Sequence, residues 1–386
     1  MTEWIECTLD KLGEIVGGAT PSTKCEDYYG GSIPWITPKD LSSFKGRYIT
    51  SGERNITEKG LASCSAQMMP KDAVLFTSRA PIGYIAIASQ SVCTNQGFKS
   101  IVVNEKADPL FVYYLLKYNK DAIEAMGSGT TFKEVSGKTM RAVKVRIPLD
   151  VSYQKRIAAV LDSLDTKIEN NERINDNLQQ QASILYGKYF PYAVTDDLPA
   201  GWRVGTVGEI VEIHDSKRIP LSGAQRAKME KRIYPYYGAA SLMDYVDEYI
   251  FDGKYLLLGE DGTVVDDAGY PILQYVWGQF WVNNHAHILT GKLGFNVESL
   301  LLLFKRTPVK SIVTGAVQPK ISQANLRSIQ VAVPPQHELD AFNELIRPLF
   351  DQIRQNQDQN KALTSLRDSL LPQLMSGEID VSDIQL

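Results

Sequence analysis

The sequence predicts an α+β protein in which two globular domains, related by a pseudo-two-fold axis, are separated by two long antiparallel helices that form a coiled-coil spacer. Three observations support this fold class: an apolar stripe with helical spacing that occurs twice, an internal repeat through most of the chain, and short strands mixed with short helices between the stripes. A chain of 386 residues with 44% hydrophobic side chains can bury more than one core.

The first stripe begins at about Gln154 and ends at about Tyr189, and a second stripe with the same spacing begins near Phe342. Its members follow one another at alternating steps of four and three, the spacing of a helix that keeps one narrow face against a partner. We therefore expect two long helices that meet along a seam. The predicted seam residues are Ile157, Leu161, Leu164, Ile168, Asn171, Asn175, Leu178, Leu185, Ile346, Leu349, Ile353, Asn356, Asn360, Leu363 and Leu370.

Two asparagines occupy equivalent positions in each stripe. A buried asparagine costs stability but fixes the register and partner of a helix pair, because its amide needs a hydrogen-bonding mate across the interface. We expect Asn171 and Asn175 to face Asn360 and Asn356. The alternative is that each helix packs only on its own domain, and the shared register of the two stripes argues against it.

The internal repeat extends beyond the helices and sets the domain organisation. Residues 13–16 resemble 208–211, and residues 93–96 resemble 281–284. The chain is therefore expected to run domain, helix, domain, helix. The predicted boundaries are 1–150 for the first domain, 151–195 for the first spacer helix, 196–333 for the second domain, and 334–386 for the second spacer helix with a C-terminal tail.

Inside each domain, alternating patterns and turn residues predict short strands and a few helices. Only about a dozen residues join the first helix to the second domain, and domain termini usually lie close together, so the long helices should run antiparallel. Pro348 should either kink the second helix or mark its true start. The predicted short elements are strands at 74–76, 84–87, 143–148, 255–258 and 329–333, and helices at 109–118 and 297–304.

Composition excludes several classes of protein. The apolar runs are far shorter than a membrane span, and the first residues lack a signal-peptide pattern, so we expect a cytoplasmic protein. The four cysteines and four histidines show no metal-ligand spacing, so we expect neither a metal nor a disulfide framework. Catalytic triads, paired carboxylates and phosphate loops do not stand out, which indicates a non-catalytic chain.

Charge allows a nucleic-acid surface. The net charge is −4, but the two globular segments are slightly basic and the helical segments are acidic. A protein that bound DNA alone would usually be more basic, so partners are expected to supply many phosphate contacts.

Candidate DNA-binding residues are hydroxyls, cations and aromatics on predicted loops. Arg79, Glu260 and Asp261 lie on equivalent turns of the two halves and have the chemistry to contact guanine (Arg) or cytosine (Glu, Asp) in the major groove. For each candidate, the alternative is a solvated charged face beside core aromatics. The set is Thr20, Ser22, Thr23, Lys24, Thr37, Lys39, Arg79, Lys133, Lys217, Arg218, Lys228, Arg232, Tyr236, Tyr237, Glu260, Asp261 and Lys320.

Three segments of the chain carry a resemblance to a known family. Residues 147–149 and 154–162 resemble the start of the first helical spacer in the specificity subunits of type I restriction-modification enzymes, although Tyr153 stands where that family usually has Glu. Residues 334–339 keep the prolines with which the family's second helical spacer starts, and then differ from the family pattern. Residues 371–379 resemble the family's C-terminal ending. The layout of two target-recognition domains alternating with two spacers covers the whole chain.

This resemblance implies a non-catalytic subunit that reads a bipartite, asymmetric site in double-stranded DNA. It also implies two methyltransferase (modification) subunits as partners, restriction/translocase subunits bound through them, and no membrane. No cofactor is expected on this chain, because S-adenosylmethionine would be held by the partner methyltransferase. The alternatives are a protein-assembly scaffold with duplicated binding domains on a coiled-coil rod, an inactive fragment of a fused enzyme, and a free-standing methyltransferase.

Overall fold

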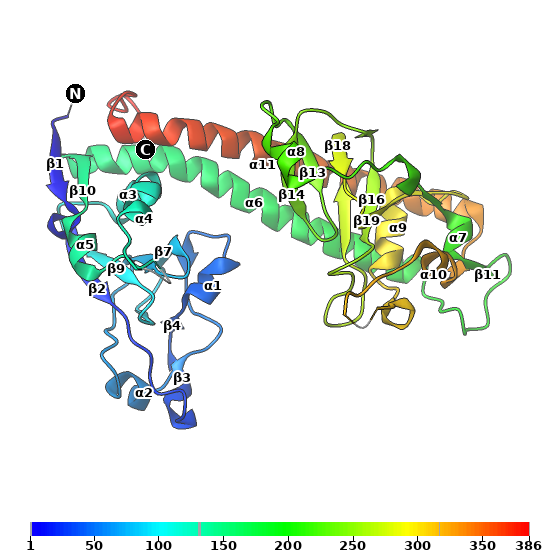
Figure 1. The fold of residues 1–386 in the computed structure, drawn as a ribbon, viewed down its shortest axis with the longest axis horizontal. Coiled ribbons are helices and arrows are strands. Elements are labelled where there is room, and N and C mark those ends of the chain that lie inside the picture. Colours follow the sequence, from blue (N-terminus) through cyan, green and yellow to red (C-terminus); the bar gives the residue numbers. More distant parts are fainter. Residues whose placement is uncertain (1, 130–132, 316, 386) are drawn as a thin grey trace. The chain divides into compact units, whose positions relative to one another are not determined.

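The computed structural model describes residues 2–129, 133–315 and 317–385 (Figure 1). The chain forms two compact units: unit 1 comprises Met1–Arg173 and Gln357–Leu386, and unit 2 comprises Ile174–Asn356. Two long helices, α6 (Val151–Tyr189) and α11 (Gln336–Ser376), contribute to both units. Each unit therefore contains one sheet-rich domain and part of each long helix.

Unit 1 contains ten short strands and five short helices in its described residues. Its strands are β1 (Trp4–Thr8), β2 (Gly13–Gly17), β3 (Tyr29–Ile33), β4 (Trp35–Ile36), β5 (Tyr48–Ile49), β6 (Val74–Ser78), β7 (Ile82–Ala88), β8 (Cys93–Thr94), β9 (Lys99–Val103) and β10 (Lys144–Pro148). Its short helices are α1 (Pro38–Ser42), α2 (Glu58–Ala62), α3 (Pro109–Tyr118), α4 (Lys120–Ala125) and α5 (Gly137–Ala142). Two 3-10 turns are η1 (Leu9–Lys11) and η2 (Glu26–Tyr28).

The described part of unit 2 repeats this pattern with ten strands and four short helices. Its strands are β11 (Arg203–Thr206), β12 (Val211–Ile213), β13 (Tyr234–Tyr237), β14 (Leu242–Val246), β15 (Phe251–Asp252), β16 (Tyr255–Gly259), β17 (Leu273–Val276), β18 (Gln279–Val282), β19 (Ala286–Gly291) and β20 (Gln330–Val333). Its short helices are α7 (Val207–Ile210), α8 (Gly223–Ala227), α9 (Val297–Phe304) and α10 (Gln323–Arg327), and its 3-10 turns are η3 (Asp215–Lys217) and η4 (Lys310–Ile312).

The main sheets of the two domains share one strand order. In unit 1 the order is β2-β9-β6-β7-β5, and in unit 2 it is β12-β19-β16-β17. The first four strands correspond one to one, and their neighbours are antiparallel in both sheets. A short parallel pair accompanies each sheet, β4 with β8 and β13 with β18. The predicted duplication is therefore confirmed at the level of topology.

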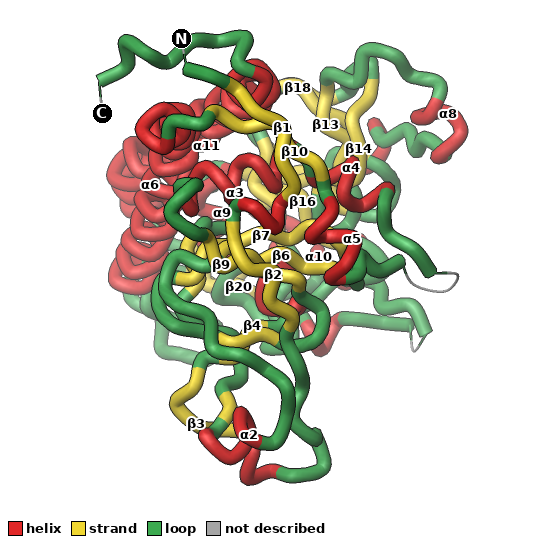
Figure 2. Tube along the Cα trace, turned by 90° about the vertical axis from the view of Figure 1, so that its left-hand side faces the viewer, coloured by secondary structure: helices red, strands yellow, loops and turns green. Residues whose placement is uncertain are grey.

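Each domain begins and ends in a two-stranded antiparallel pair, β1 with β10 and β11 with β20. Figure 2 shows β1 and β10 side by side. Both figures show β3 and α2 as a small lobe away from α6. Since β10 leads into α6 and β20 leads into α11, the chain leaves each domain beside the point where it began. This is the closeness of domain termini on which the antiparallel prediction relied.

The long helices begin where proline ends a strand. Pro148 ends β10, and Asp150 then caps α6 by accepting a hydrogen bond from the Ser152 N–H at 2.8 Å. Helix α11 begins at Gln336, directly after two prolines, and continues through Pro348. The prediction that Pro348 could mark the true start is therefore wrong. Its ring is exposed, so the position loses one backbone hydrogen bond without a buried clash.

Each domain core is continuous with both long helices. In unit 1, Ile157 and Leu161 of α6 and Leu374 of α11 join the cluster around the sheet and α3. In unit 2, Tyr186 of α6 and Phe342 of α11 join the cluster around the sheet and α9. Burying a large apolar side chain is worth about 1.5–3 kcal/mol, so these contacts hold each domain on its helix pair. They exclude the alternative in which each helix packs only on its own domain.

The predicted asparagine partners meet in both units. In unit 1, Asn171 donates its side-chain N–H to the amide oxygen of Asn360 at 2.8 Å, and Asn360 donates to the Ile168 carbonyl at 3.3 Å. Both asparagines lie where α6 and α11 run in opposite directions, because Asp165, earlier in α6, contacts Arg367, later in α11.

Unit 2 contains the equivalent contact. Asn356 donates to the amide oxygen of Asn175 at 2.8 Å, and Asn175 donates to the Ile353 carbonyl at 3.3 Å. The hypothesis that Asn171 and Asn175 face Asn360 and Asn356 is thus confirmed. All the predicted seam residues are buried or half-buried.

Ion pairs add directional contacts between domain and helices. In unit 1, Arg47 is only 6% exposed and bonds the Asp162 carbonyl and the Thr166 hydroxyl, each at 2.9 Å, and the Glu169 carboxylate at 3.1 Å. In unit 2, Glu298 on α9 accepts hydrogen bonds from Tyr275 at 2.7 Å and from Arg354 on α11 at 3.0 Å.

Asp165 joins three elements of unit 1. Its carboxylate accepts hydrogen bonds from Tyr114 of α3 at 2.8 Å and from Arg367 of α11 at 2.6 Å. Burial opposes ionisation of this carboxyl, but Lys117, Arg367 and Tyr114 outweigh burial and hold its pKa below the usual value. The charged form of Asp165 therefore stabilises the fold.

None of the helices in the described ranges is both long enough and apolar enough to cross a membrane. The four cysteines are free thiols, and burial raises the pKa of Cys93 to about 12.

We predict that Asn171→Leu destabilises the chain by roughly 1–3 kcal/mol, because the side-chain oxygen of the half-buried Asn360 loses its donor in the seam. Adding Asn360→Leu should recover most of this loss, since an apolar pair suits the seam. Urea unfolding of the two single variants and the double variant measures the coupling. Asn177→Leu, on the exposed side of α6, is the matched control. A double variant no more stable than the singles would contradict the pairing.

We also predict that Asp165→Asn lowers the free energy of unfolding at pH 7 by roughly 1–3 kcal/mol, because a buried charged hydrogen-bond partner is lost. Since the folded pKa is depressed, this stabilisation is complete above the usual Asp pKa of about 4 and disappears as the pH falls through the folded value. The difference in unfolding free energy between wild type and variant should therefore shrink as the pH falls from about 4 toward 3. A difference that stays constant over this range would refute the charged role; exposed Asp176→Asn is the control.

Candidate nucleic-acid interface

A turn after the central strand occupies the same place in both units. Arg79 directly follows β6, and Glu260 directly follows β16, the corresponding strand in the common order. The prediction that these turns are equivalent is therefore confirmed. Each turn pairs with the segment before a short helix, through the bridges Arg79 to Glu134 and Asp261 to Lys320.

A second turn lies beside the first in both units. In unit 1 the side-chain oxygen of Asn95 accepts the Gly97 N–H at 2.9 Å, and the Gly97 carbonyl accepts the Ser78 N–H at 2.7 Å. These bonds fold the chain after β8 into an Asx turn and place it against the end of β6.

Unit 2 repeats both bonds. The side-chain oxygen of Asn283 accepts the His285 N–H at 2.8 Å, and the His285 carbonyl accepts the Glu260 N–H at 2.8 Å. We call these assemblies the strand-end edges: Thr20, Arg79, Asn95, Gln96 and Glu134 in unit 1, and Glu260, Asp261, Asn284, His285 and Lys320 in unit 2.

The edge of unit 1 carries a loosely paired cation. Arg79 lies 3.6 Å from the Glu134 carboxylate and is 35% exposed, while Lys99 lies 3.5 Å from the same carboxylate. Thr20 donates its hydroxyl to the amide oxygen of Gln96. This edge therefore offers a guanidinium, an amide and a hydroxyl to the solvent.

The edge of unit 2 is built on a buried ion network. Arg218 bonds the Glu260 carboxylate at 2.6 Å and approaches Asp215 at 3.4 Å, and Asp215 also accepts a hydrogen bond from His287 at 2.6 Å. Glu260 is 13% exposed, and Lys320 adds a further contact at 3.3 Å. These neighbours give Glu260 and Arg218 a structural role in unit 2, and their direct contact with bases or phosphates stays a prediction.

Electrostatics support this assignment. Burial opposes ionisation of the Asp215 carboxyl, but its hydrogen bond and charge interaction with His287 outweigh burial and lower its pKa. Among the described residues, Asp215, Glu260 and His287 bring ligand atoms within 4.8 Å of one another, a spacing that a cation could use. The Arg218 guanidinium already pairs with both carboxylates, so the group is an ion network rather than an open metal site.

Three of the predicted DNA-binding residues of unit 2, Lys217, Lys228 and Arg232, are exposed cations. Arg232 contacts Asp244 at 2.6 Å but stays 50% exposed. Tyr236 is 1% exposed and its hydroxyl accepts the Leu221 N–H at 3.0 Å, so its predicted DNA contact is corrected to a packing role.

Tyr237 and Asp261 are also engaged. Tyr237 is half-buried with its ring edge against Phe280, at 5.8 Å between ring centroids. Asp261 contacts the imidazole of His285. Both side chains, predicted as DNA contacts, therefore already have partners within unit 2.

The other candidates of unit 1 lie on loops or at the start of α1. Ser22, Thr23, Lys24 and Lys133 are exposed. Lys39 is exposed but pairs with Glu53 at 2.8 Å. Thr37 serves as the N-cap of α1 in a capping box with Asp40, which is a structural use of its hydroxyl.

Gln96 and Asn284 lie at the strand-end edges but are absent from the predicted DNA-binding residues. Both are exposed, and each directly follows the asparagine that closes the Asx turn of its unit. The resemblance between residues 93–96 and 281–284 was the available signal. Their neighbours on β6 and β16 are distant in sequence, so the sequence did not place them at an edge.

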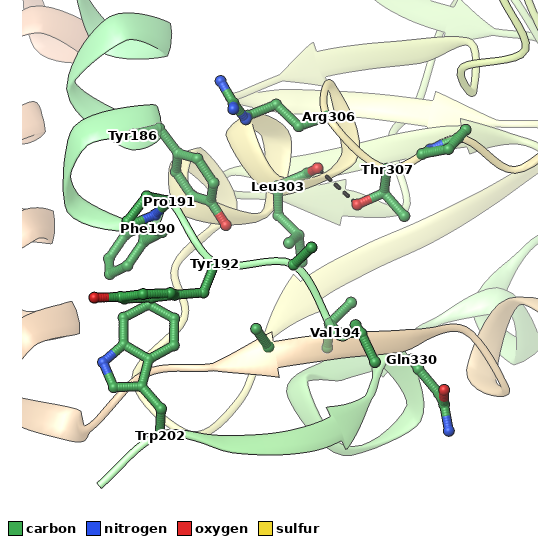
Figure 3. Close-up of a pocket in the computed structure, with 14 residues that line it drawn as sticks. Tyr186, Phe190, Pro191, Tyr192, Val194, Trp202, Leu303, Arg306, Thr307 and Gln330 are labelled. Carbon is green, nitrogen blue, oxygen red and sulfur yellow. Dashed lines mark hydrogen bonds between the residues drawn. The ribbon is translucent and has the colours of Figure 1, made fainter. Parts of the chain in front are cut away.

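Unit 2 also contains an aromatic pocket of about 310 Å³ at the end of α6 (Figure 3). Tyr186, Phe190, Tyr192 and Trp202 line it together with Arg306. Among the described lining residues there is no carboxylate, cysteine or histidine. The pocket therefore adds no acid-base pair to the site.

Comparisons with known proteins agree with this architecture. A family model described as the type I restriction modification DNA specificity domain matches residues 1–180 and 199–365. The MjaIX type I restriction enzyme specificity subunit of Methanocaldococcus jannaschii is 32% identical, over 99% of this chain and 95% of its own length. The EcoprrI specificity subunit of Escherichia coli is 25% identical, over 86% of this chain and 83% of its own length.

A solved structure shares the fold. The type I restriction-modification system S subunit from M. genitalium matches with a TM-score of 0.60 and 17% identity, covering 97% of this chain and 96% of that one. The family match spans most of both units, and the resemblance identified from the helix starts and the C-terminal ending is confirmed. The chain belongs to the family of type I restriction-modification DNA specificity subunits.

Proposed function

We propose that this chain reads a bipartite, asymmetric site in double-stranded DNA, one half with each unit. The duplicated strand-end edge carries this proposal. The two edges share their backbone bonds but differ in side chains, with Arg79 and Gln96 in one and Lys320 and Asn284 in the other. Two domains with the same backbone but different side chains at the edge can contact two half-sites of different base sequence.

The exposed cations are suited to contact phosphates. Lys24 and Lys133 in unit 1, and Lys217, Lys228 and Arg232 in unit 2, lie on or beside loops and keep exposed charge. Phosphate contacts position a protein on DNA without reading sequence. With a net charge of −4, the chain would rely on partners for much of its affinity.

The partners we propose are two methyltransferase subunits and, through them, restriction/translocase subunits. The chain itself would be non-catalytic and would act in the cytoplasm. S-adenosylmethionine would bind the methyltransferase, which would flip its target base out of the duplex. The helices α6 and α11 would set the separation of the half-sites.

Sequence selection tests the proposal. A tagged full-length chain, purified from its own cells so that bound subunits accompany it, should enrich a split motif with two unlike halves from a randomised duplex pool. Enrichment should weaken steeply as salt rises, because phosphate contacts release counterions. The isolated chain should transfer no methyl groups. A pool that stays random would favour the scaffold function instead.

The spacing role has its own test. Seven residues inserted after Arg173 and after Asn356 keep the seam in phase and lengthen each helix by roughly 10 Å. The gap between half-sites should grow by about three base pairs, at 3.4 Å per base pair along a strand. The same selection measures the gap. An insertion of seven residues at 195–199, outside both helices, should leave the gap unchanged, and an unchanged gap in the helix variant would refute the role.

A further inference from the structure

The two Asx turns present one amide side chain each. Asn95 uses its side-chain oxygen to close its turn, and Asn283 does the same in unit 2. The oxygens of both amides are therefore already engaged as hydrogen-bond acceptors. The next residues, Gln96 and Asn284, are exposed. The duplicated backbone thus displays an amide at the same position of both edges, although the two side chains differ in length.

The turns are held rigidly. The Asn95 N–H donates to the Ile36 carbonyl at 3.0 Å and the Asn283 N–H donates to the Tyr237 carbonyl at 3.0 Å, both at the ends of the short parallel strand pairs. The residue after each amide is bonded to the end of the central strand through the Gly97 and His285 carbonyls. A reading group gains precision when its backbone is fixed by regular elements in this way.

Nearby groups fit a DNA-reading edge. Gln96 lies on the same edge as Arg79, and Asn284 lies on the same edge as Lys320, which is 48% exposed. Thr20 donates to the oxygen of Gln96, and a carbonyl oxygen has a second lone pair, so the amide is oriented but can still accept another hydrogen bond.

An amide offers one donor and one acceptor side by side. In the major groove only adenine shows an acceptor and a donor on one base, N7 and the N6 amino group, in a matching arrangement. We propose that Gln96 and Asn284 are specificity-determining residues, each reading an adenine in the half-site of its own unit. This proposal rests on the proposed function and deepens it.

Sequence selection with variants of the full-length chain tests this. Gln96→Ala should reduce the preference for adenine at one position of one half-site at least about fivefold and leave the other half unchanged. Asn284→Ala should do the same in the other half. Gln96→Arg and Asn284→Arg should move the preference at those positions toward guanine, which Arg contacts through O6 and N7.

Controls separate the possible failures. Gln181→Ala removes an exposed amide from α6 and should leave both halves of the motif unchanged. A wild-type chain that enriches no motif overturns the proposed function and this inference with it. A wild-type motif that survives unchanged in both alanine variants and in both arginine variants overturns the inference alone.

Discussion

The hydrogen bonds between asparagines in the helix seam are the constraint on which the rest of the structure depends. Asn171 with Asn360, and Asn356 with Asn175, fix which turn of α6 faces which turn of α11. Because an unpaired amide in the seam would cost about 1–3 kcal/mol, other registers are disfavoured. Each domain core then includes residues from both helices, so the register of the helices also determines how each domain is completed.

Within that frame, the domains use one backbone design twice. The same strand order, the same parallel pair and the same Asx turn bring distant segments to one edge in each unit. The side chains on the edges have diverged: unit 1 carries a partly exposed guanidinium, that of Arg79, and unit 2 carries a buried ion network around Glu260. Because the backbone is shared and the side chains differ, one fold can recognise two different half-sites.

Local periodicity explains what the sequence could predict. The seam and its asparagine partners follow from a spacing typical of a paired helix, together with the shared register of the two stripes. Helices α3 and α9 begin and end where predicted, because Pro109 starts one clear apolar helix and Asn296 caps the other. Contacts between residues distant in sequence explain the misses. The packing of Tyr236 against Leu221 and the pairing of Glu260 with Arg218 arise only once the strands are assembled. For the same reason, Gln96 and Asn284 could not be placed beside β6 and β16.

The central claim is that each unit is an independent reader built on the same design. A chain in which residues 1–150 are replaced by a second copy of residues 196–333 tests it most directly, with randomised duplex DNA as the probe. We predict that the enriched motif becomes an inverted repeat of the half-site read by unit 2, because the internal repeat of the sequence predicts two readers related by a pseudo-two-fold axis. A well-folded hybrid that still selects the wild-type asymmetric motif would contradict the account.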